Sequence, residues 1–224
     1  MYQLGDGIKF LKNAKPESID GIFCDPPWGS GPKIQGQKTW KKILKAIDEN
    51  GSRALRRGGR VLIWVGTRQL GETIKCFTKL EYKWAHFVKY IPPRYISCYE
   101  SCSDPILVFS KAGEKMFYRK GKCIPQIFLK PSTGRRDTAH PCSRPIEVVR
   151  KLLHHYFKPG EIVVDPCAGS DTTGYSCREL DINYETFEID PKMYETGIER
   201  HRQGFLFEMP LARSFRLSSG SGKE

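Results

Sequence analysis

Short runs of apolar residues alternate along this chain with segments in which apolar residues recur at every third or fourth position. The clearest runs are Ile19–Cys24 and residues 60–65, and both indicate strands that are buried on two faces of a sheet. Helical spacing is clearest at residues 39–50, where apolar side chains fall on one side and three lysines on the other. By these criteria we predict strands at residues 2–4, 19–24, 60–65, 83–91, 105–109, 161–164 and 184–189, and helices at residues 7–14, 39–50, 69–80, 145–157, 172–180 and 191–202.

The order of these elements predicts the fold class. Alternating strands and helices indicate an α/β fold with a Rossmann-like, mostly parallel, twisted sheet that carries helices on both faces. Residues 111–139 break the alternation, because they are basic, rich in turn-forming residues and without clear periodicity. We expect one domain over residues 1–203, with residues 111–139 as a short basic insert, and a flexible tail over residues 204–224.

Composition narrows the class of protein. The chain has 224 residues, which suits one compact domain, and 39% of them are hydrophobic, which is enough to form a core. Lysine and arginine total 37 against 25 aspartate and glutamate, and the resulting net charge of +12 favours a polyanionic partner such as nucleic acid.

Cysteine spacing and hydropathy indicate where such a protein would work. None of the 8 cysteines belongs to a C-x-x-C pair, and Cys98 and Cys102 are too isolated to form a zinc site, so we expect no metal. No signal peptide is evident, and no apolar run approaches the ~18 residues of a membrane span. We therefore expect a soluble intracellular protein without a membrane partner, cytoplasmic in a prokaryote or virus and nuclear in a eukaryote.

A first group of chemically suggestive residues follows the apolar run Ile19–Cys24. One short loop combines a carboxylate, two carbonyls of stiff prolines and a flat aromatic face, supplied by Asp25, Pro26, Pro27 and Trp28. Asp25 and the Pro26 carbonyl could accept both N–H bonds of an exocyclic amino group, which would free the nitrogen lone pair, while Trp28 stacks on the base. The alternative is a rigid turn with its tryptophan in the core.

A second group lies in a glycine-bearing loop between residues 161–164 and the predicted helix at residues 172–180. Gly169 lets a ligand approach the backbone, and Glu188 follows about 20 residues later, where an acid normally accepts hydrogen bonds from ribose hydroxyls. An adenosine-containing cofactor is therefore expected. Asp171 would repel a pyrophosphate at the helix N-terminus, which disfavours a dinucleotide oxidoreductase and favours the phosphate-free, cationic S-adenosylmethionine.

Together the two groups resemble the DNA amino methyltransferases of permuted (β-type) order, in which a D-P-P-[YW] segment precedes the cofactor loop. The resemblance covers residues 4–202 and implies a circularly permuted, Rossmann-like methyltransferase domain. It also implies S-adenosylmethionine as the cofactor and methylation of adenine N6 or cytosine N4. The matching segments are Gly5-Asp6, DPPW at 25–28, HPCSRP at 140–145, DPCAGS at 165–170 with TTG at 172–174, and FEID at 187–190.

The resemblance assigns a role to each matching residue. Residues 25–28 would form the catalytic pocket, Asp6 would lie near the cofactor adenine, and Glu188 would bind its ribose. Ser143 and Arg144 would approach the methionine end, where an arginine could pair with the carboxylate. The other residues expected to bind the cofactor are Asp165, Cys167, Ala168, Gly169, Ser170 and Thr172.

The resemblance leaves the target base and the activity open to alternatives. Asp25 favours adenine N6, because the cytosine-N4 members more often have serine there. The D-P-P-W spelling is also similar to that of the eukaryotic mRNA adenosine methyltransferases, so adenine in RNA is a further alternative. Cys167 replaces a usual phenylalanine and Asp171 a usual glycine, and these departures permit a non-catalytic, nucleic-acid-binding subunit with the same fold.

Lysine and arginine side chains should bind the phosphates of the nucleic acid. The candidates form one group after the catalytic loop and a second group in the basic insert, where the family keeps its target-recognition region. Because the insert is short, a homodimer or a second subunit could complete recognition. The first group is Lys33, Lys38, Lys41 and Lys42, and the second is Lys115, Arg119, Lys120, Lys122, Lys130, Arg135 and Arg136.

Overall fold

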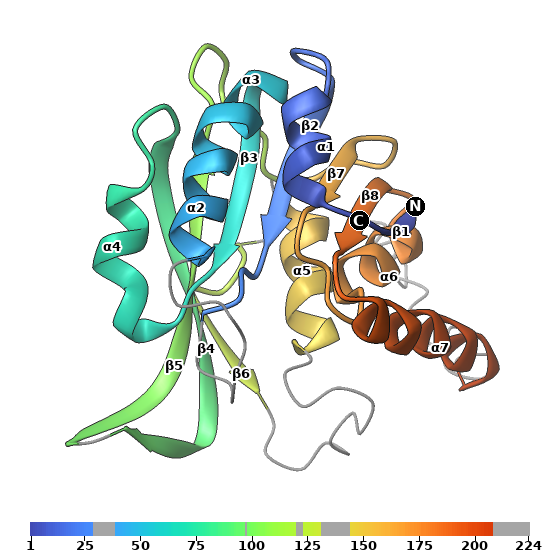
Figure 1. Cartoon of the computed structure of the whole chain (residues 1–224). Coiled ribbons are helices and arrows are strands. Elements are labelled where there is room, and N and C mark those ends of the chain that lie inside the picture. Colours follow the sequence, from blue (N-terminus) through green and yellow to red (C-terminus); the bar gives the residue numbers. More distant parts are fainter. Residues whose placement is uncertain (29–38, 97, 120–122, 131–143, 208–224) are drawn as a thin grey trace, which may run out of the picture.

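A computed structural model of the chain describes residues 1–28, 39–96, 98–119, 123–130 and 144–207 (Figure 1). Its strands belong to a single 8-stranded sheet. The strands are β1 (Tyr2–Leu4), β2 (Ile19–Cys24), β3 (Leu55–Trp64), β4 (Glu81–Ile96), β5 (Tyr99–Ser110), β6 (Ile127–Lys130), β7 (Ile162–Asp165) and β8 (Asn183–Glu188).

The sheet order places two distant parts of the chain next to each other. The order is β1-β8-β7-β2-β3-β5-β4-β6, and neighbouring strands are parallel except where β5 pairs with β3 and β4. β2 and β7 are parallel neighbours in the middle of the sheet, so their carboxyl ends lie side by side at one edge. We call this edge, which carries the residues after β2 and β7, the carboxyl edge. The mostly parallel sheet confirms the predicted fold class.

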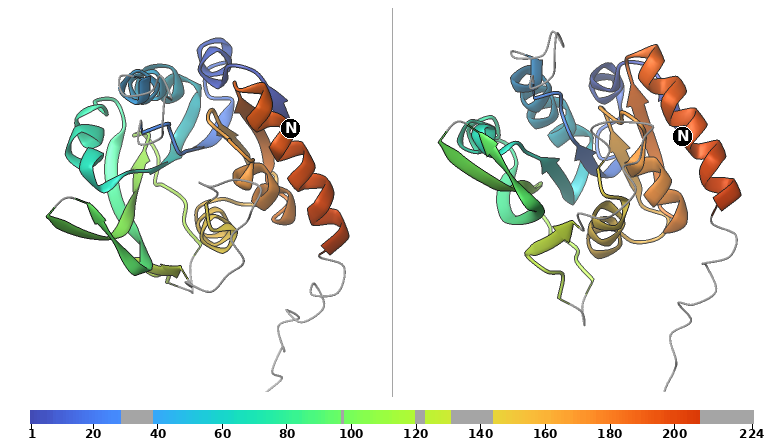
Figure 2. Two further views of the ribbon diagram at one scale, coloured as in Figure 1. Left: turned by 60° about the horizontal axis from the view of Figure 1, so that its bottom comes forward. Right: turned by 90° about the horizontal axis from the view of Figure 1, so that it is seen from below.

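Helices cover both faces of the sheet (Figure 2). α1 (Gly7–Asn13) and α2 (Thr39–Ala46) contribute to the buried cluster on one face, and α5 (Ile146–Tyr156) and α6 (Thr172–Glu179) contribute to the cluster on the other. No helix in the described part of the chain is both long and apolar enough to cross a membrane. The remaining helices are α3 (Ser52–Ala54), α4 (Leu70–Lys75) and α7 (Pro191–Phe207).

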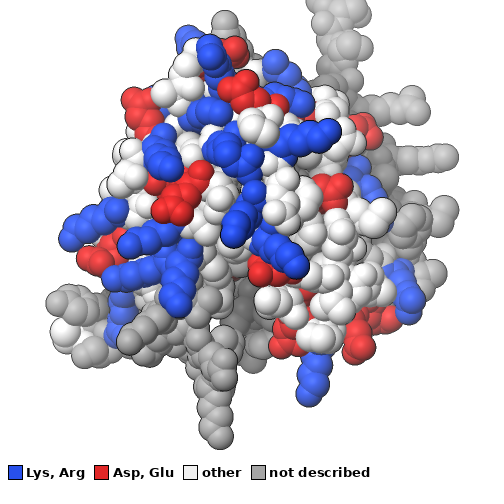
Figure 3. All heavy atoms as spheres, turned by 45° about the horizontal axis from the view of Figure 1, so that its top comes forward, with Lys and Arg blue, Asp and Glu red and all other residues white. Residues whose placement is uncertain are grey.

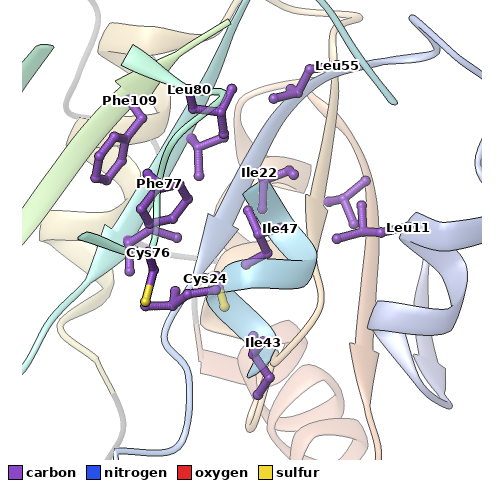
Figure 4. Packing of buried hydrophobic residues seen from close by; sticks show 14 of the residues in the cluster. Leu11, Ile22, Cys24, Ile43, Ile47, Leu55, Cys76, Phe77, Leu80 and Phe109 are labelled. Carbon is purple, nitrogen blue, oxygen red and sulfur yellow. The ribbon is translucent and has the colours of Figure 1, made fainter. Parts of the chain in front are cut away.

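The alternation of side chains along β2 explains why both faces are apolar. Ile22 faces the cluster that contains Leu11 and Ile47 (Figure 4), whereas Phe23 faces the cluster that contains Phe157. Burial of each such side chain contributes about 1.5–3 kcal/mol to stability. Gly21, which precedes Ile22 on β2, must lack a side chain because a Cβ at this position would overlap the ring of Phe157.

The hairpin of β4 and β5 is longer than the predicted strands at residues 83–91 and 105–109. The two prolines at positions 92 and 93 favoured an earlier end, because proline cannot donate a hydrogen bond to a neighbouring strand. In the structure the pairing of β4 with β5 shifts register between Lys89 and Arg94 and then continues. A local irregularity of this kind accommodates the prolines without ending the strand.

One predicted helix is shorter than expected, and Asp48 contacts the residues that are left out of it. Residues 39–50 are helical as predicted, since α2 continues into a π-helical turn at Ile47–Gly51, which contains Asp48. The buried carboxylate of Asp48 accepts hydrogen bonds from the backbone N–H groups of residues 78–80. Residues 78–80 are held by Asp48 outside α4, which ends at Lys75 and which we predicted to span residues 69–80.

Two further differences concern the insert and the tail. The insert at residues 111–139, predicted to be irregular, contains β6, which pairs in parallel with β4 at the sheet edge. α7 runs to Phe207, so the helix continues into the segment that we expected to be a flexible tail from residue 204.

Candidate active site

The loop after β2 places the predicted catalytic residues at the carboxyl edge. Pro26 is buried, whereas Asp25, Pro27 and Trp28 are partly buried. The indole Nε1 of Trp28 donates a hydrogen bond to Asp25 Oδ1 at 3.1 Å. The Trp28 ring also packs against Trp40 at the start of α2, with ring centroids 5.1 Å apart. The carboxylate and the indole are therefore held together, with part of the ring left open to a ligand.

Arg144, immediately before α5, is the main partner of Asp25. Its Nε donates to Asp25 Oδ2 at 2.5 Å, and its Nη2 donates to Asp25 Oδ1 at 2.8 Å. Burial opposes the charge of Arg144, but the attraction of Asp25 outweighs it and raises the pKa of Arg144 above its usual range. The structure places the guanidinium of Arg144 on Asp25, and its predicted contact with the methionine end of a cofactor stays a prediction.

Three residues that the sequence analysis missed complete the surroundings of Arg144. Its guanidinium lies 4.7 Å from the ring centroid of the buried Trp64, at the end of β3. Its Nη1 is 3.5 Å from Asp104 Oδ2 on β5, and this carboxylate also accepts a 2.7 Å hydrogen bond from the Tyr90 hydroxyl. Arg144 thus connects the loop after β2 with the hairpin of β4 and β5. No local sequence signal marks these three residues.

The loop after β7 is shaped by Asp165. Its buried carboxyl group accepts hydrogen bonds from Thr173 Oγ1 at 2.6 Å and from the Cys167 backbone N–H at 3.0 Å. Burial raises the pKa of Asp165 to about 8. Asp165 therefore holds the ends of the loop together, and Cys167 and Ala168 lie partly buried between them.

Glu188 ties this loop to the end of β8. Its Oε2 accepts a hydrogen bond from the Gly169 N–H at 2.9 Å, and its Oε1 accepts one from the Asp190 N–H at 2.8 Å. On the neighbouring strand, the N–H of Gly5 donates to the Glu188 carbonyl at 2.8 Å. Asp6 follows directly and caps α1 through its Oδ1. Asp6, Gly169 and Glu188 are therefore brought to one edge of the sheet.

Residues at the start of α6 are held by α7. Ser170 and Thr172 are nearly buried, and Arg200 Nη1 lies 3.0 Å from Ser170 Oγ and 2.7 Å from Thr172 Oγ1. The hydroxyls of Ser170 and Thr172 therefore contact α7, and the predicted binding of a cofactor by these two residues stays a prediction. Asp171 accepts a 3.0 Å hydrogen bond from the Gly174 N–H and so caps α6.

Among the predicted phosphate-binding residues, the four whose side chains the structure describes do not gather at one place. Lys41 and Lys42 lie on α2 close to Trp28, although Lys41 Nζ is 2.8 Å from Glu72 Oε2. The backbone carbonyl of Lys115 packs beside Gly58 at the start of β3, and Arg119 donates from Nε to the His154 carbonyl near the end of α5. Both therefore lie at the amino ends of the central strands, opposite the carboxyl edge, and a part for them in phosphate binding stays a prediction.

Lysine and arginine side chains do gather on that opposite face, interleaved with carboxylates (Figure 3). Lys130 ends β6, and its side chain is outside the described part of the structure. Seven other predicted residues lie outside the described residues, namely Lys33, Lys38, Lys120, Lys122, Arg135, Arg136 and Ser143.

Comparison with known proteins agrees with this arrangement. A family model described as DNA methylase matches residues 19–199 of the chain. The chain is 27% identical over 237 residues to the DNA adenine methyltransferase YhdJ of Escherichia coli (strain K12), covering 88% of this chain and 80% of that protein. It is 23% identical over 225 residues to the type II methyltransferase M.HpaI of Haemophilus parainfluenzae, covering 87% of this chain and 72% of that protein.

Solved structures show the same fold. The crystal structure of the M1.HpyAVI complex with S-adenosylmethionine superposes with a TM-score of 0.72 at 23% identity, covering 90% of this chain and 99% of that chain. The PvuII DNA methyltransferase (cytosine-N4-specific) superposes with a TM-score of 0.70 at 16% identity, covering 89% of this chain and 85% of that chain. The fold is therefore the Rossmann-like fold of these methyltransferases.

Proposed function

Because this chain belongs to the DNA methylase family, whose cofactor is S-adenosylmethionine, we propose that it methylates N6 of adenine in DNA. One observation carries the proposal. Asp25 lies at the end of β2, next to the cofactor loop at the end of β7, and Arg144 and Trp28 fix its carboxylate there. Asp25 and the adenine specificity in the name of YhdJ both favour adenine over cytosine.

The residues at the ends of β7 and β8 fit S-adenosylmethionine. Gly169 has φ 55°, and open space lies where its side chain would stand, so a ligand can approach the backbone closely. Each carboxylate oxygen of Glu188 accepts a hydrogen bond from one backbone N–H. Because a carboxylate can accept about four hydrogen bonds, Glu188 can also accept hydrogen bonds from ribose hydroxyls. When bound, this cofactor supplies a methyl group on a positively charged sulfur.

Asp25 would act on the amino group of the base. Its Oδ1 already accepts from Arg144 and Trp28, whereas its Oδ2 accepts only from Arg144 among the described residues. The free position on Oδ2 and the carbonyl of Pro26 would accept the two N–H bonds of adenine N6. The nitrogen lone pair is then available for attack, and the positive charge that develops on nitrogen is stabilised. The exposed part of the Trp28 ring would hold the base by stacking.

The departures at Cys167 and Asp171 do not obstruct this function. The carboxylate of Asp171 is fully buried and engages Gly174 and His201, so it does not project into the loop. Cys167 is partly buried beside the β2 core and donates its backbone N–H to Asp165. These observations support an enzyme over a subunit that only binds nucleic acid. A homodimer or second subunit stays a prediction of the sequence.

The direct test is product identification. The purified protein is incubated with methyl-labelled S-adenosylmethionine and, in separate reactions, with duplex DNA, single-stranded DNA and RNA, and the labelled nucleoside is identified after digestion. We expect N6-methyladenine from DNA. Labelled N4-methylcytosine would show that the target base is cytosine rather than adenine. Label in RNA alone would show that the substrate is RNA rather than DNA. Absence of label in every reaction would contradict the proposed activity.

Asp25→Ala separates catalysis from binding. Loss of the acceptor should lower methyl transfer by about 10²–10³-fold, the usual effect of removing a group that stabilises developing charge. Affinity for S-adenosylmethionine, measured by calorimetry, and affinity for DNA should remain close to wild type. Glu114→Ala removes an exposed carboxylate near the amino ends of the strands and is the matched control.

A further inference from the structure

Asp171 occupies a position that favours glycine. Its backbone is left-handed, with φ 56°, which residues with a side chain rarely adopt. Its carboxylate is fully buried, and burial of a carboxylate is unfavourable unless hydrogen bonds and a charged partner compensate for it. Gly174 provides the necessary space, because a Cβ at that position would overlap the carboxylate of Asp171. The start of α6 is thus built around this carboxylate.

Each oxygen of Asp171 has a partner. Oδ1 accepts the cap hydrogen bond from the Gly174 N–H at 3.0 Å, and Oδ2 lies 2.8 Å from His201 Nε2 on α7. The His201 side chain is only 15% exposed. Its ring lies between those of Tyr2 and Tyr175, with centroid distances of 5.9 and 5.8 Å. The imidazole is therefore fixed in place beside the carboxylate.

Arg200 holds the residues on both sides of Asp171. One guanidinium nitrogen, Nη1, contacts the hydroxyls of Ser170 and Thr172 at 3.0 and 2.7 Å. The hydroxyl of Tyr2 donates a 2.6 Å hydrogen bond to the carbonyl of Gly169. Residues 169–172 are consequently fixed from outside the loop by α7 and β1, at each of four consecutive positions.

We infer that Arg200 and His201 are positioning residues for cofactor binding. Consecutive residues of α7 hold the loop so that Gly169 keeps its left-handed backbone, its open side and its hydrogen bond to Glu188. His201 in particular compensates for the buried carboxylate that Asp171 introduces. The inference rests on the proposed function, because it takes the ligand of this loop to be S-adenosylmethionine.

A double-substitution cycle with His201→Ala, Asp171→Gly and the combined variant tests this pairing. His201→Ala should weaken the binding of S-adenosylmethionine by about tenfold or more, because it leaves a buried oxygen of Asp171 without its hydrogen-bond partner. The KM for S-adenosylmethionine should rise by a similar factor, while kcat at saturating cofactor stays within about twofold, since no reacting group changes.

Asp171→Gly should restore the binding that His201→Ala loses. Glycine adopts the left-handed conformation without strain and replaces an N-cap residue at little cost in stability. In the Asp171→Gly background His201→Ala should therefore change affinity less than about twofold. Arg202→Ala removes a side chain that is 75% exposed on the same helix and is the matched control.

The outcomes separate this inference from the proposed function. Equal loss of affinity from His201→Ala in both backgrounds, or no loss in either, overturns the inference. Failure of the wild-type protein to bind S-adenosylmethionine overturns the proposed function instead. In that case thermal unfolding without cofactor tests the contact between Asp171 and His201, using the wild type, the two single variants and the combined variant. His201→Ala should lower Tm by about 3–8 °C only where Asp171 is present, and equal shifts in both backgrounds reject the pairing.

Discussion

Replacement of Arg144 by alanine tests whether this side chain orients the catalytic carboxylate or binds the cofactor. Arg144 donates two charge-assisted hydrogen bonds to Asp25, at 2.5 and 2.8 Å, and the two side chains are 22% and 25% exposed. Each such bond contributes about 1.5–3 kcal/mol, and partial exposure places these two at the lower end. Their loss therefore removes about 3 kcal/mol of orienting interaction. Since about 1.36 kcal/mol changes a rate tenfold, kcat should fall by about 100-fold.

The assay measures kcat and KM for S-adenosylmethionine at saturating DNA, together with cofactor affinity by calorimetry. If Arg144 orients Asp25, Arg144→Ala lowers kcat while the cofactor Kd changes less than about threefold. Arg144→Lys keeps the positive charge but cannot donate two parallel hydrogen bonds to Asp25. The kcat of this variant should therefore lie between those of the wild type and Arg144→Ala. Arg57→Ala removes an exposed arginine far from the carboxyl edge and serves as the control. An unchanged kcat with a cofactor affinity lowered tenfold or more would refute the reasoning and assign Arg144 to the cofactor.

Two further predictions concern stability. The pKa of Asp165 is raised by burial to about 8, so stability from its bound proton is complete below the unfolded pKa of about 3.9 and is lost as pH rises through 8. The Tm of wild type should therefore fall more between pH 5 and 9 than that of Asp165→Asn, and parallel curves would contradict this. Gly21→Ala forces a Cβ into the ring of Phe157 and should lower Tm by about 5 °C or more. Gly71→Ala, with open space at its Cβ, should not lower Tm, and similar losses for both would show that the overlap relaxes.

The sequence predicts an element well when its signal is local. Ile19–Cys24 is an apolar run that ends at an aspartate and two prolines, and its observed bounds are the predicted ones. β6 has no comparable signal. It is a strand of 4 residues, and it exists because it pairs with β4 at the edge of the sheet, which depends on residues about forty positions earlier. The hydrogen bonds that hold residues 78–80 on Asp48, outside α4, likewise depend on contacts that only the folded chain creates.

The same distinction applies to the site. Parallel neighbours bring the loops after β2 and β7 together, and this follows from the general rule for ligand sites at the carboxyl ends of such strands. The partner of each charged side chain does not follow from any rule of this kind. Arg144 reaches Asp25 across 119 positions of the chain because Trp64 supports its guanidinium. A sequence motif can thus indicate that Arg144 belongs to the site without indicating which carboxylate it binds.

Asp171 shows why a departure from a family pattern is difficult to judge from neighbouring residues alone. Viewed locally, a carboxylate in place of glycine adds backbone strain and buried charge to the cofactor loop. Both disadvantages are compensated at a distance, by Gly174, which provides space and a hydrogen bond, and by His201 from another helix. The departure is therefore weak evidence for a subunit without activity. The stronger evidence lies in Asp25, since a protein that only binds nucleic acid has no need for a carboxylate fixed by two donors at the end of β2.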